Sequence, residues 1–186
     1  MIVPFRGDPA ALERLLAVLE RLELADDDEV IVADNRLASA AEHRCGHVKI
    51  CPAGGIRSPG FARNRGAALA RGEWLVFIDA DTVLEPSLVA DYFDPVPAPD
   101  TAILAGGIRD VAARPTAVAR HSAERAQLSQ SVTLARADSP YAQTANCAVR
   151  RAAFAEVGGF AQEARAGEDA DFCFRIAQAG RKLEVR

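Results

Sequence analysis

The sequence has no long hydrophobic run and no excess of basic residues. Its longest unbroken apolar run, Trp74 to Ile78, is five residues, whereas a membrane-spanning helix needs about 20. The 186 residues carry a formal net charge of −4. This balance argues against a nucleic-acid-binding protein, which needs a basic surface. We therefore expect no transmembrane segment and no nucleic-acid partner.

The sequence also lacks a paired cysteine motif and a visible signal peptide. Its four cysteines, Cys45, Cys51, Cys147 and Cys173, form no CxxC pair. No basic segment followed by an apolar stretch precedes the first predicted strand. A disulfide framework or a zinc site is therefore not expected. Unpaired thiols in a reducing cytoplasm are the favoured interpretation, and we expect a cytoplasmic location.

Short apolar runs alternate with helical patterns over the first 80 residues. Strands are predicted over Ile2–Phe5, Glu29–Ala33, His47–Ile50 and Glu73–Ile78. Helices are predicted from Pro9 to Leu22, with Asp8 as the N-cap, and over Phe61–Arg71. This alternation predicts a parallel sheet with helices on both faces. Such sheets bind ligands beyond the carboxyl ends of their strands.

The pattern is looser after residue 80. Short helices are predicted over Pro86–Phe93, Arg151–Val157 and Glu168–Ala179, and a mostly polar helix from Thr116 to Ala135. Strands are predicted over Thr101–Ile108, Tyr141–Val149 and Lys182–Val185. No internal repeat interrupts this order, and the length fits one domain.

Asp79-Ala80-Asp81 follows the clearest predicted strand, EWLVFI. Two carboxylates one residue apart repel each other, and a hard divalent cation would relieve that repulsion and bridge to a diphosphate. The alternative is that Asp81 caps the next turn while Asp79 accepts hydrogen bonds from local amides. The position at a strand end favours a ligand site.

Asp34 and Arg63 are two further candidates. Asp34 ends the second strand, where it would face the same crevice and accept a hydrogen bond from a base or ribose. The alternative for Asp34 is a turn-forming Asp-Asn pair. Arg63 lies in a predicted helix, where it would reach a phosphate or support the site carboxylates. The alternative for Arg63 is a solvated helix face.

Gly167-Glu168-Asp169-Ala170-Asp171 opens a predicted helix. Acidic residues in a first helical turn are stabilised by the helix dipole, which is a sufficient structural explanation. A carboxylate held at a helix start is equally well placed to act as a general base. The residues alone leave both interpretations open.

Five segments carry a resemblance to a known family: IVPFRG, EVIVADN, ARNRGAALARGEWLVFIDADTVLEP, NCAVRRAAFAEVGGF and GEDADFCFRIAQAG. The order and rough spacing of these segments, from Ile2 to about Val185, resemble those of the family 2 glycosyltransferases. The resemblance implies the GT-A fold, a Rossmann-like three-layer α/β/α arrangement with a mostly parallel central sheet. It also implies one domain over residues 1–186. A nucleotide-binding half would cover about 1–100, and a donor-sugar and acceptor half about 101–186.

The resemblance implies roles for individual residues. Nucleotide-binding positions of the family match Pro4, Phe5, Asp34, Arg63, Asp79 and Ala80. Asp34 would recognise the base, commonly uracil. Asp79 and Asp81 match the DxD pair that holds Mn²⁺ or Mg²⁺, the second usually binding the ion. Asp169 matches the catalytic base, Glu168 lies beside it near the acceptor, and Asn146 is the best candidate for shaping the donor-sugar pocket.

The activity implied is transfer of a sugar, with inversion, from a nucleoside diphosphate, UDP-linked by expectation. The acceptor would be a saccharide, a lipid-linked molecule or a small molecule, and a peripheral membrane contact is compatible with it. Two departures from the family stand out. The second strand ends in Ala33-Asp34-Asn35-Arg36 rather than in two acidic residues followed by Gly or Ser, and no QxxRW-type motif is present.

Two alternatives remain beside the transferase. A catalytically inactive nucleotide-sugar-binding module would keep the same motifs without turnover. A nucleotidyltransferase has a similar fold, but it needs a Gly-rich phosphate loop followed by a lysine after the first strand. Arg6-Gly7-Asp8-Pro9 lacks that pattern, so the nucleotidyltransferase is disfavoured.

Overall fold

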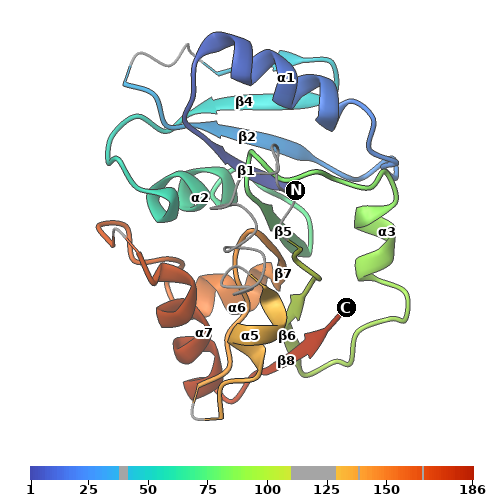
Figure 1. Ribbon diagram of the computed structural model, residues 1–186, viewed down its shortest axis with the longest axis vertical. Helices are drawn as coiled ribbons and strands as arrows, with labels where there is room; N and C mark the ends of the chain where they lie inside the picture. The colour runs from blue at the N-terminus through green and yellow to red at the C-terminus, as the bar shows by residue number, and fades with distance from the viewer. Residues whose placement is uncertain (38–41, 110–128, 138, 165) are drawn as a thin grey trace, which may run out of the picture.

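The computed structural model describes residues 1–37, 42–109, 129–137, 139–164 and 166–186 (Figure 1). Within these residues one mixed sheet runs through the molecule in the strand order β3-β4-β2-β1-β5-β7-β6-β8. The same residues contain no helix that is both long enough and apolar enough to cross a membrane.

The N-terminal part of the sheet is built from strand–helix units. Its elements are β1 (Ile2–Phe5), α1 (Pro9–Leu19), β2 (Val30–Asp34), β3 (His43–Cys45), β4 (Val48–Pro52), α2 (Pro59–Ala67) and β5 (Trp74–Ile78). β4, β2, β1 and β5 run parallel, in a register that pairs Phe5 with Asp34. The carboxyl ends of β1, β2 and β5 therefore meet at one edge.

The C-terminal part changes strand direction. Its elements are α3 (Leu88–Tyr92), β6 (Thr101–Ala105), α5 (Gln130–Leu134), β7 (Asn146–Arg150), α6 (Arg151–Glu156), α7 (Glu168–Gln178) and β8 (Lys182–Val185). β7 lies antiparallel to both β5 and β6, and β8 adds to β6 in parallel. Because β7 pairs with β5, the later part of the chain comes back beside the Asp79–Asp81 segment.

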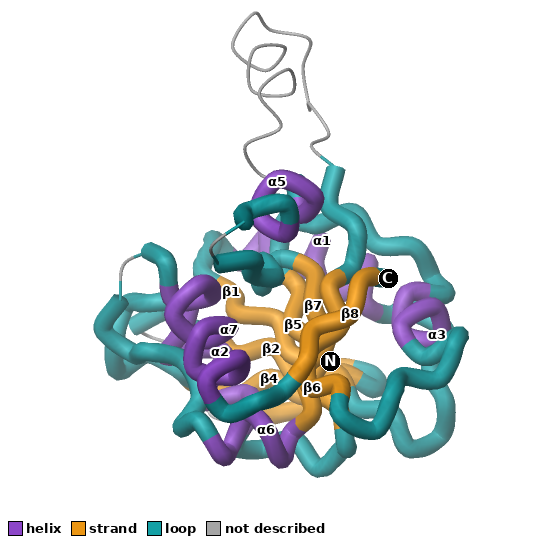
Figure 2. The backbone as a smooth tube through the Cα atoms, turned by 90° about the horizontal axis from the view of Figure 1, so that it is seen from below, coloured by secondary structure: helices purple, strands orange, loops and turns teal. Residues whose placement is uncertain are grey.

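Helices cover both faces of the sheet, as expected for strands buried on each side. Val30 and Val32 of β2 pack with Leu15 and Leu19 of α1, while Ile31 on the opposite face packs against α2. A larger cluster on that second face joins β5 and β7 to α6 and α7. Figure 2 shows α2, α6 and α7 on one side of the strands and α3 on the other.

Most predicted elements are present with shifted ends. Asp8 caps α1 as predicted, its Oδ1 accepting from the Ala11 N–H at 2.7 Å. α2 begins at Pro59, before the predicted start, because the Ser58 hydroxyl caps it through the Phe61 N–H at 3.0 Å. It also ends early, at Ala67.

Two predictions in less regular parts of the chain need correction or lie outside the described residues, and one short strand was not predicted. The strand predicted over Tyr141–Val149 begins only at Asn146. β3 was missed, because its three residues are all exposed and carry no apolar signal. The polar helix predicted from Thr116 to Ala135 lies largely outside the described residues, and its described end forms α5.

Candidate functional site

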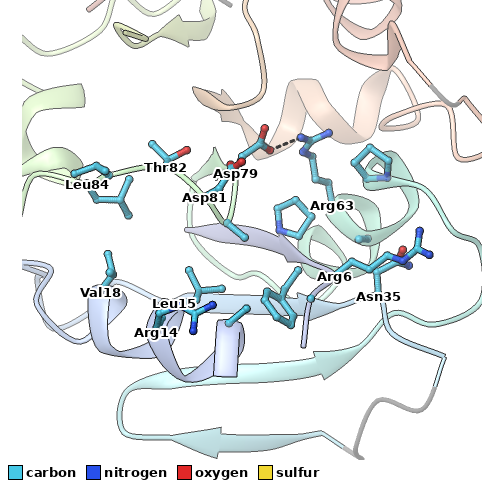
Figure 3. A pocket seen from close by; sticks show the side chains of 18 of the residues that line it. Arg6, Arg14, Leu15, Val18, Asn35, Arg63, Asp79, Asp81, Thr82 and Leu84 are labelled. Carbon is cyan, nitrogen blue, oxygen red and sulfur yellow. Dashed lines mark hydrogen bonds and ion pairs between the residues drawn. The ribbon is translucent and has the colours of Figure 1, made fainter. Parts of the chain in front are cut away.

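A cavity of about 830 Å³ opens where β1, β2 and β5 end (Figure 3). This volume is typical of small-molecule sites, which span roughly 300–1,000 Å³. Its charged lining consists of five arginines and three carboxylates: Arg6, Arg14, Arg21, Arg57, Arg63, Asp79, Asp81 and Glu168. The formal excess of positive charge suits an anionic ligand.

Arg63 of α2 connects two acidic motifs that are far apart in the sequence. Its Nη2 donates to Asp79 Oδ1 at 2.7 Å, and its Nη1 donates to Glu168 Oε1 at 2.9 Å. Arg63 is only 3% exposed, and its guanidinium carbon lies 5.8 Å from the centre of the Phe160 ring. The expected support of the site carboxylates by Arg63 is therefore present, and the solvated-face alternative for this residue is wrong.

The two DxD carboxylates have different surroundings. Asp79 is held by Arg63, although its side chain is 38% exposed. Asp81 is exposed and forms no ion pair with the described residues, and Figure 3 shows both aspartates at the same part of the cavity. No group of three His, Cys, Asp or Glu side chains suited to a metal occurs among the described residues. A cation bound here would need further ligands from water or from a substrate.

The acidic start of α7 lies on the opposite side of Arg63. Gly167 precedes the helix with a φ of +80°, a left-handed conformation that glycine adopts readily. Glu168 is buried and lines the cavity, whereas Asp169 is half-buried and does not. Burial, reinforced by the charge of Glu168, raises the pKa of Asp169, although its Oδ1 accepts from the Ala170 N–H at 2.9 Å. A raised pKa makes a carboxylate a better proton acceptor.

Asp34 sits at the end of β2 but does not line the cavity. It is 1% exposed, and its carboxylate is occupied by Arg36. The neighbouring Asn35 does line the cavity, and its side-chain amide donates to the backbone carbonyls of Ala53 and Ile56. Recognition of a base by Asp34 thus stays a prediction. The structure adds that Arg36 forms an ion pair with the carboxylate of Asp34.

Asn146, expected near a donor sugar, starts β7 and is buried away from the cavity lining. Its Oδ1 accepts from the Tyr92 hydroxyl at 2.6 Å, and its Nδ2 donates to the Gly107 carbonyl at 2.9 Å. These bonds tie β7 to α3 and to the chain that follows β6. A contact of Asn146 with a sugar stays a prediction.

Residues 1–158 match the family model described as "Glycosyl transferase family 2". The chain belongs to glycosyl transferase family 2. It is also similar to the pre-mycofactocin glycosyltransferase of Mycobacterium tuberculosis, with 28% identity over 202 residues that cover 98% of this chain and 40% of that protein. The chain therefore spans less than half the length of this curated relative.

Solved structures share the fold of this member of glycosyl transferase family 2. The mannosyltransferase PcManGT from Pyrobaculum calidifontis, in complex with GDP-Man and Mn²⁺, has a TM-score of 0.69 at 20% identity and covers 100% of this chain and 53% of its own. TarS 1–349 from S. aureus, in complex with UDP-GlcNAc, has a TM-score of 0.67 at 18% identity, with 100% of this chain and 54% of its own covered. These likenesses confirm the predicted GT-A fold.

The cavity of this family 2 member brings together most of the predicted residues: Pro4, Phe5, Arg63, Asp79, Ala80, Asp81 and Glu168. Sequence reasoning missed Arg6, Arg14, Arg21 and Arg57, which also line it. Arg14 and Arg21 are seven residues apart, two turns along the helix predicted from Pro9 to Leu22, a spacing that could have indicated a common surface. In the structure Arg21 lies just after the end of α1. Arg57 precedes the α2 cap and carries no comparable signal.

Proposed function

We propose that this chain is the catalytic region of a metal-assisted, inverting glycosyltransferase that moves a sugar from a nucleoside diphosphate to an acceptor hydroxyl. The double ion pair of Arg63 carries this proposal. It joins Asp79, at the donor cavity, to Glu168, the residue directly before the candidate base Asp169. A donor site and a proton acceptor beside each other are what direct glycosyl transfer requires.

The charge of the cavity supports a diphosphate donor. Arginines bind phosphate oxygens through charge-assisted hydrogen bonds, and five arginines line the cavity. Solved relatives of the same fold are described in complex with GDP-Man and with UDP-GlcNAc. A nucleoside diphosphate sugar is the donor class that fits both observations.

Asp81 and Asp79 are the residues that would hold a divalent cation. Asp81 is exposed and unpaired among the described residues, and carboxylate oxygens are preferred ligands of Mg²⁺ and Mn²⁺. When bound, such an ion supplies Lewis-acid stabilisation of the leaving diphosphate. A site with only two protein carboxylates fits an ion that shares its remaining positions with substrate phosphates.

Asp169 is proposed as the general base. The acceptor oxygen would attack the anomeric carbon as its proton passes to Asp169, while the bond from that carbon to the diphosphate oxygen breaks. Attack opposite the leaving group inverts the anomeric centre. Glu168 is less suited to this role, because its carboxylate already accepts from Arg63 at 2.9 Å.

A matched pair of variants tests the base. Asp169→Asn should lower turnover by about 10²–10⁴-fold, the usual contribution of general-base catalysis, while donor affinity measured by calorimetry stays near wild type. Asp171→Asn is the control, since Asp171 pairs with Arg175 one helical turn away. If wild-type protein bound a donor but gave no product with any acceptor class, a binding module would replace the enzyme.

A further inference from the structure

The side chain of Arg36 is held in one orientation at the end of β2. Its Nε donates to Asp34 Oδ1 at 2.8 Å, and its Nη2 donates to Asp34 Oδ2 at 2.7 Å. Its backbone N–H donates to the same Oδ1 at 3.1 Å. Asp34 is 1% exposed, whereas the side chain of Arg36 is 27% exposed. The arginine is therefore the partner that meets solvent.

Two further contacts restrict this arginine. Its guanidinium carbon lies 5.5 Å from the centre of the Phe5 ring, within the range of a cation–π contact. A Cβ at Gly54 would lie 2.6 Å from the Arg36 carbonyl oxygen, so the chain after β4 approaches the Arg36 backbone closely. Arg36 is thus fixed from both its backbone and its side chain.

The ion pair leaves one edge of the guanidinium unused. A guanidinium has five N–H donors in a planar fork. Asp34 takes the side formed by Nε and Nη2, as the two distances show. Among the described residues, no acceptor meets the end formed by Nη1 and the second hydrogen of Nη2, which carries two parallel donors. A ligand that meets Arg36 here must offer two adjacent acceptors.

Arg36 lines a second cavity of about 360 Å³ together with Arg6, Gly7, Asn35, Leu37 and Arg57. Arg6, Gly7, Asn35 and Arg57 also line the main cavity. The two cavities therefore meet at the carboxyl ends of β1 and β2. A nucleotide with its phosphates near Asp81 can extend its base toward Arg36.

We propose that Arg36 reads the base of the nucleotide donor and selects guanine, an inference that rests on the proposed function. Guanine presents two adjacent acceptors, O6 and N7, on one edge, and a bidentate arginine is their commonest specific partner. Adenine places an amino group beside N7, and uracil places its N3–H donor beside O4. Cytosine also carries two neighbouring acceptors, N3 and O2, so the test below includes it. Asp34 is then a positioning residue, because both its oxygens face Arg36 rather than an imide N–H.

Calorimetry with the full chain and Mn²⁺ tests this assignment, using GDP, CDP, UDP, ADP and inorganic pyrophosphate as probes. Wild type should bind GDP about 5- to 150-fold more tightly than UDP or ADP, the discrimination expected of one bidentate pair. Arg36→Gln should remove that preference and leave pyrophosphate affinity unchanged. Arg36→Lys should also lose it, because lysine keeps the charge but not the fork. Arg44→Gln, on the exposed strand β3, is the control.

Asp34→Asn tests whether Asp34 acts by positioning Arg36, because this variant weakens the bonds that hold the Arg36 side chain but leaves that side chain in place. The GDP preference should fall while pyrophosphate binding stays. If Arg36→Gln does not fold with Asp34 left unpaired, the double variant Asp34→Asn/Arg36→Gln removes both charges and takes its place. Equal affinity for all bases, a preference for UDP or CDP, or an equal loss for every probe would overturn the role of Arg36 and leave the proposed function standing. Absence of binding by every probe would overturn the proposed function and this inference with it.

Discussion

Two acidic motifs from different parts of the chain meet at Arg63, and they differ in the surroundings of their second carboxylate. In each motif the first acid, Asp79 or Glu168, is held by the arginine. Asp81 is exposed to solvent, whereas Asp169 is half-buried and its pKa is raised by burial. Solvation keeps a carboxylate charged and suits it to a cation, while burial suits it to accepting a proton.

Substitution of Arg63 removes the positive charge that both acidic motifs share. Arg63→Gln leaves the buried Glu168 without its charged partner, and such a loss costs about 3–5 kcal/mol. We expect that decrease in the free energy of unfolding by urea denaturation. The control is Arg71→Gln, whose exposed pair with Glu29 is worth about 1 kcal/mol or less.

A double variant shows whether the loss comes from the ion pair. Arg63→Gln combined with Glu168→Gln removes both charges, so most of the stability should return relative to Arg63→Gln alone. If the double variant is as unstable as the sum of the two single variants, Arg63 stabilises the fold through packing on Phe160 instead.

The raised pKa of Asp169 predicts how activity and stability depend on pH. Turnover needs the deprotonated base, so kcat should fall about tenfold per pH unit below the raised pKa. The folded state binds this proton more tightly than the unfolded state, so its contribution to stability is present at low pH and lost as pH rises through the folded pKa.

Asp169→Asn should therefore be at least as stable as wild type at neutral pH, although its turnover should be much lower. Thermal unfolding and kcat measured across the acidic range check both statements. A variant that loses activity and stability together would indicate that Asp169 is mainly a structural residue of α7.

The parallel part of the fold was predictable because local patterns encode it. WLVFI is a continuous apolar run that ends in Asp79-Ala80-Asp81. Asp8 caps α1 through the backbone N–H three residues later, as predicted. The meeting of β1, β2 and β5 ends follows from parallel pairing. The position of the cavity, at the carboxyl ends of these strands, could thus be predicted from the sequence, whereas four of its five arginines could not.

The remaining features depend on side-chain geometry or distant contacts. Arg63 and Glu168 are 105 residues apart, and no spacing rule connects them. Asp34 was expected to face a ligand, but whether a carboxylate meets a ligand or Arg36 is decided by rotamers that periodicity does not encode. β3 could not be predicted, because its residues are exposed and it forms only by pairing with β4.

The exposed carboxylate of Asp81 is the part of the two motifs that is expected to bind a cation. Saturation with Mn²⁺ and a nucleoside diphosphate at 100 times Kd should stabilise wild type by about 2.7 kcal/mol. Asp81→Asn should lose most of this gain and leave the protein without ligand within about 0.5 kcal/mol of wild type, because Asp81 is exposed. EDTA should reduce the wild-type gain to that of the variant. An undiminished thermal shift in either case would exclude a metal at Asp81.

The smallest effect is expected at the cavity rim, at Arg14. This residue is exposed on α1, next to the buried Leu15, which anchors the helix to β2. Arg14→Gln should leave stability unchanged and weaken diphosphate binding by about 0.2–1 kcal/mol at low salt, as for an exposed charge pair. The loss should vanish between about 0.01 M and 1 M salt, because the screening length falls from about 30 Å to 3 Å. Calorimetry at both salt concentrations measures this, with Asp81→Asn as the reference whose effect persists. A loss at Arg14 that is independent of salt would mean that it bonds the ligand directly, and the rim would then belong to the donor site itself.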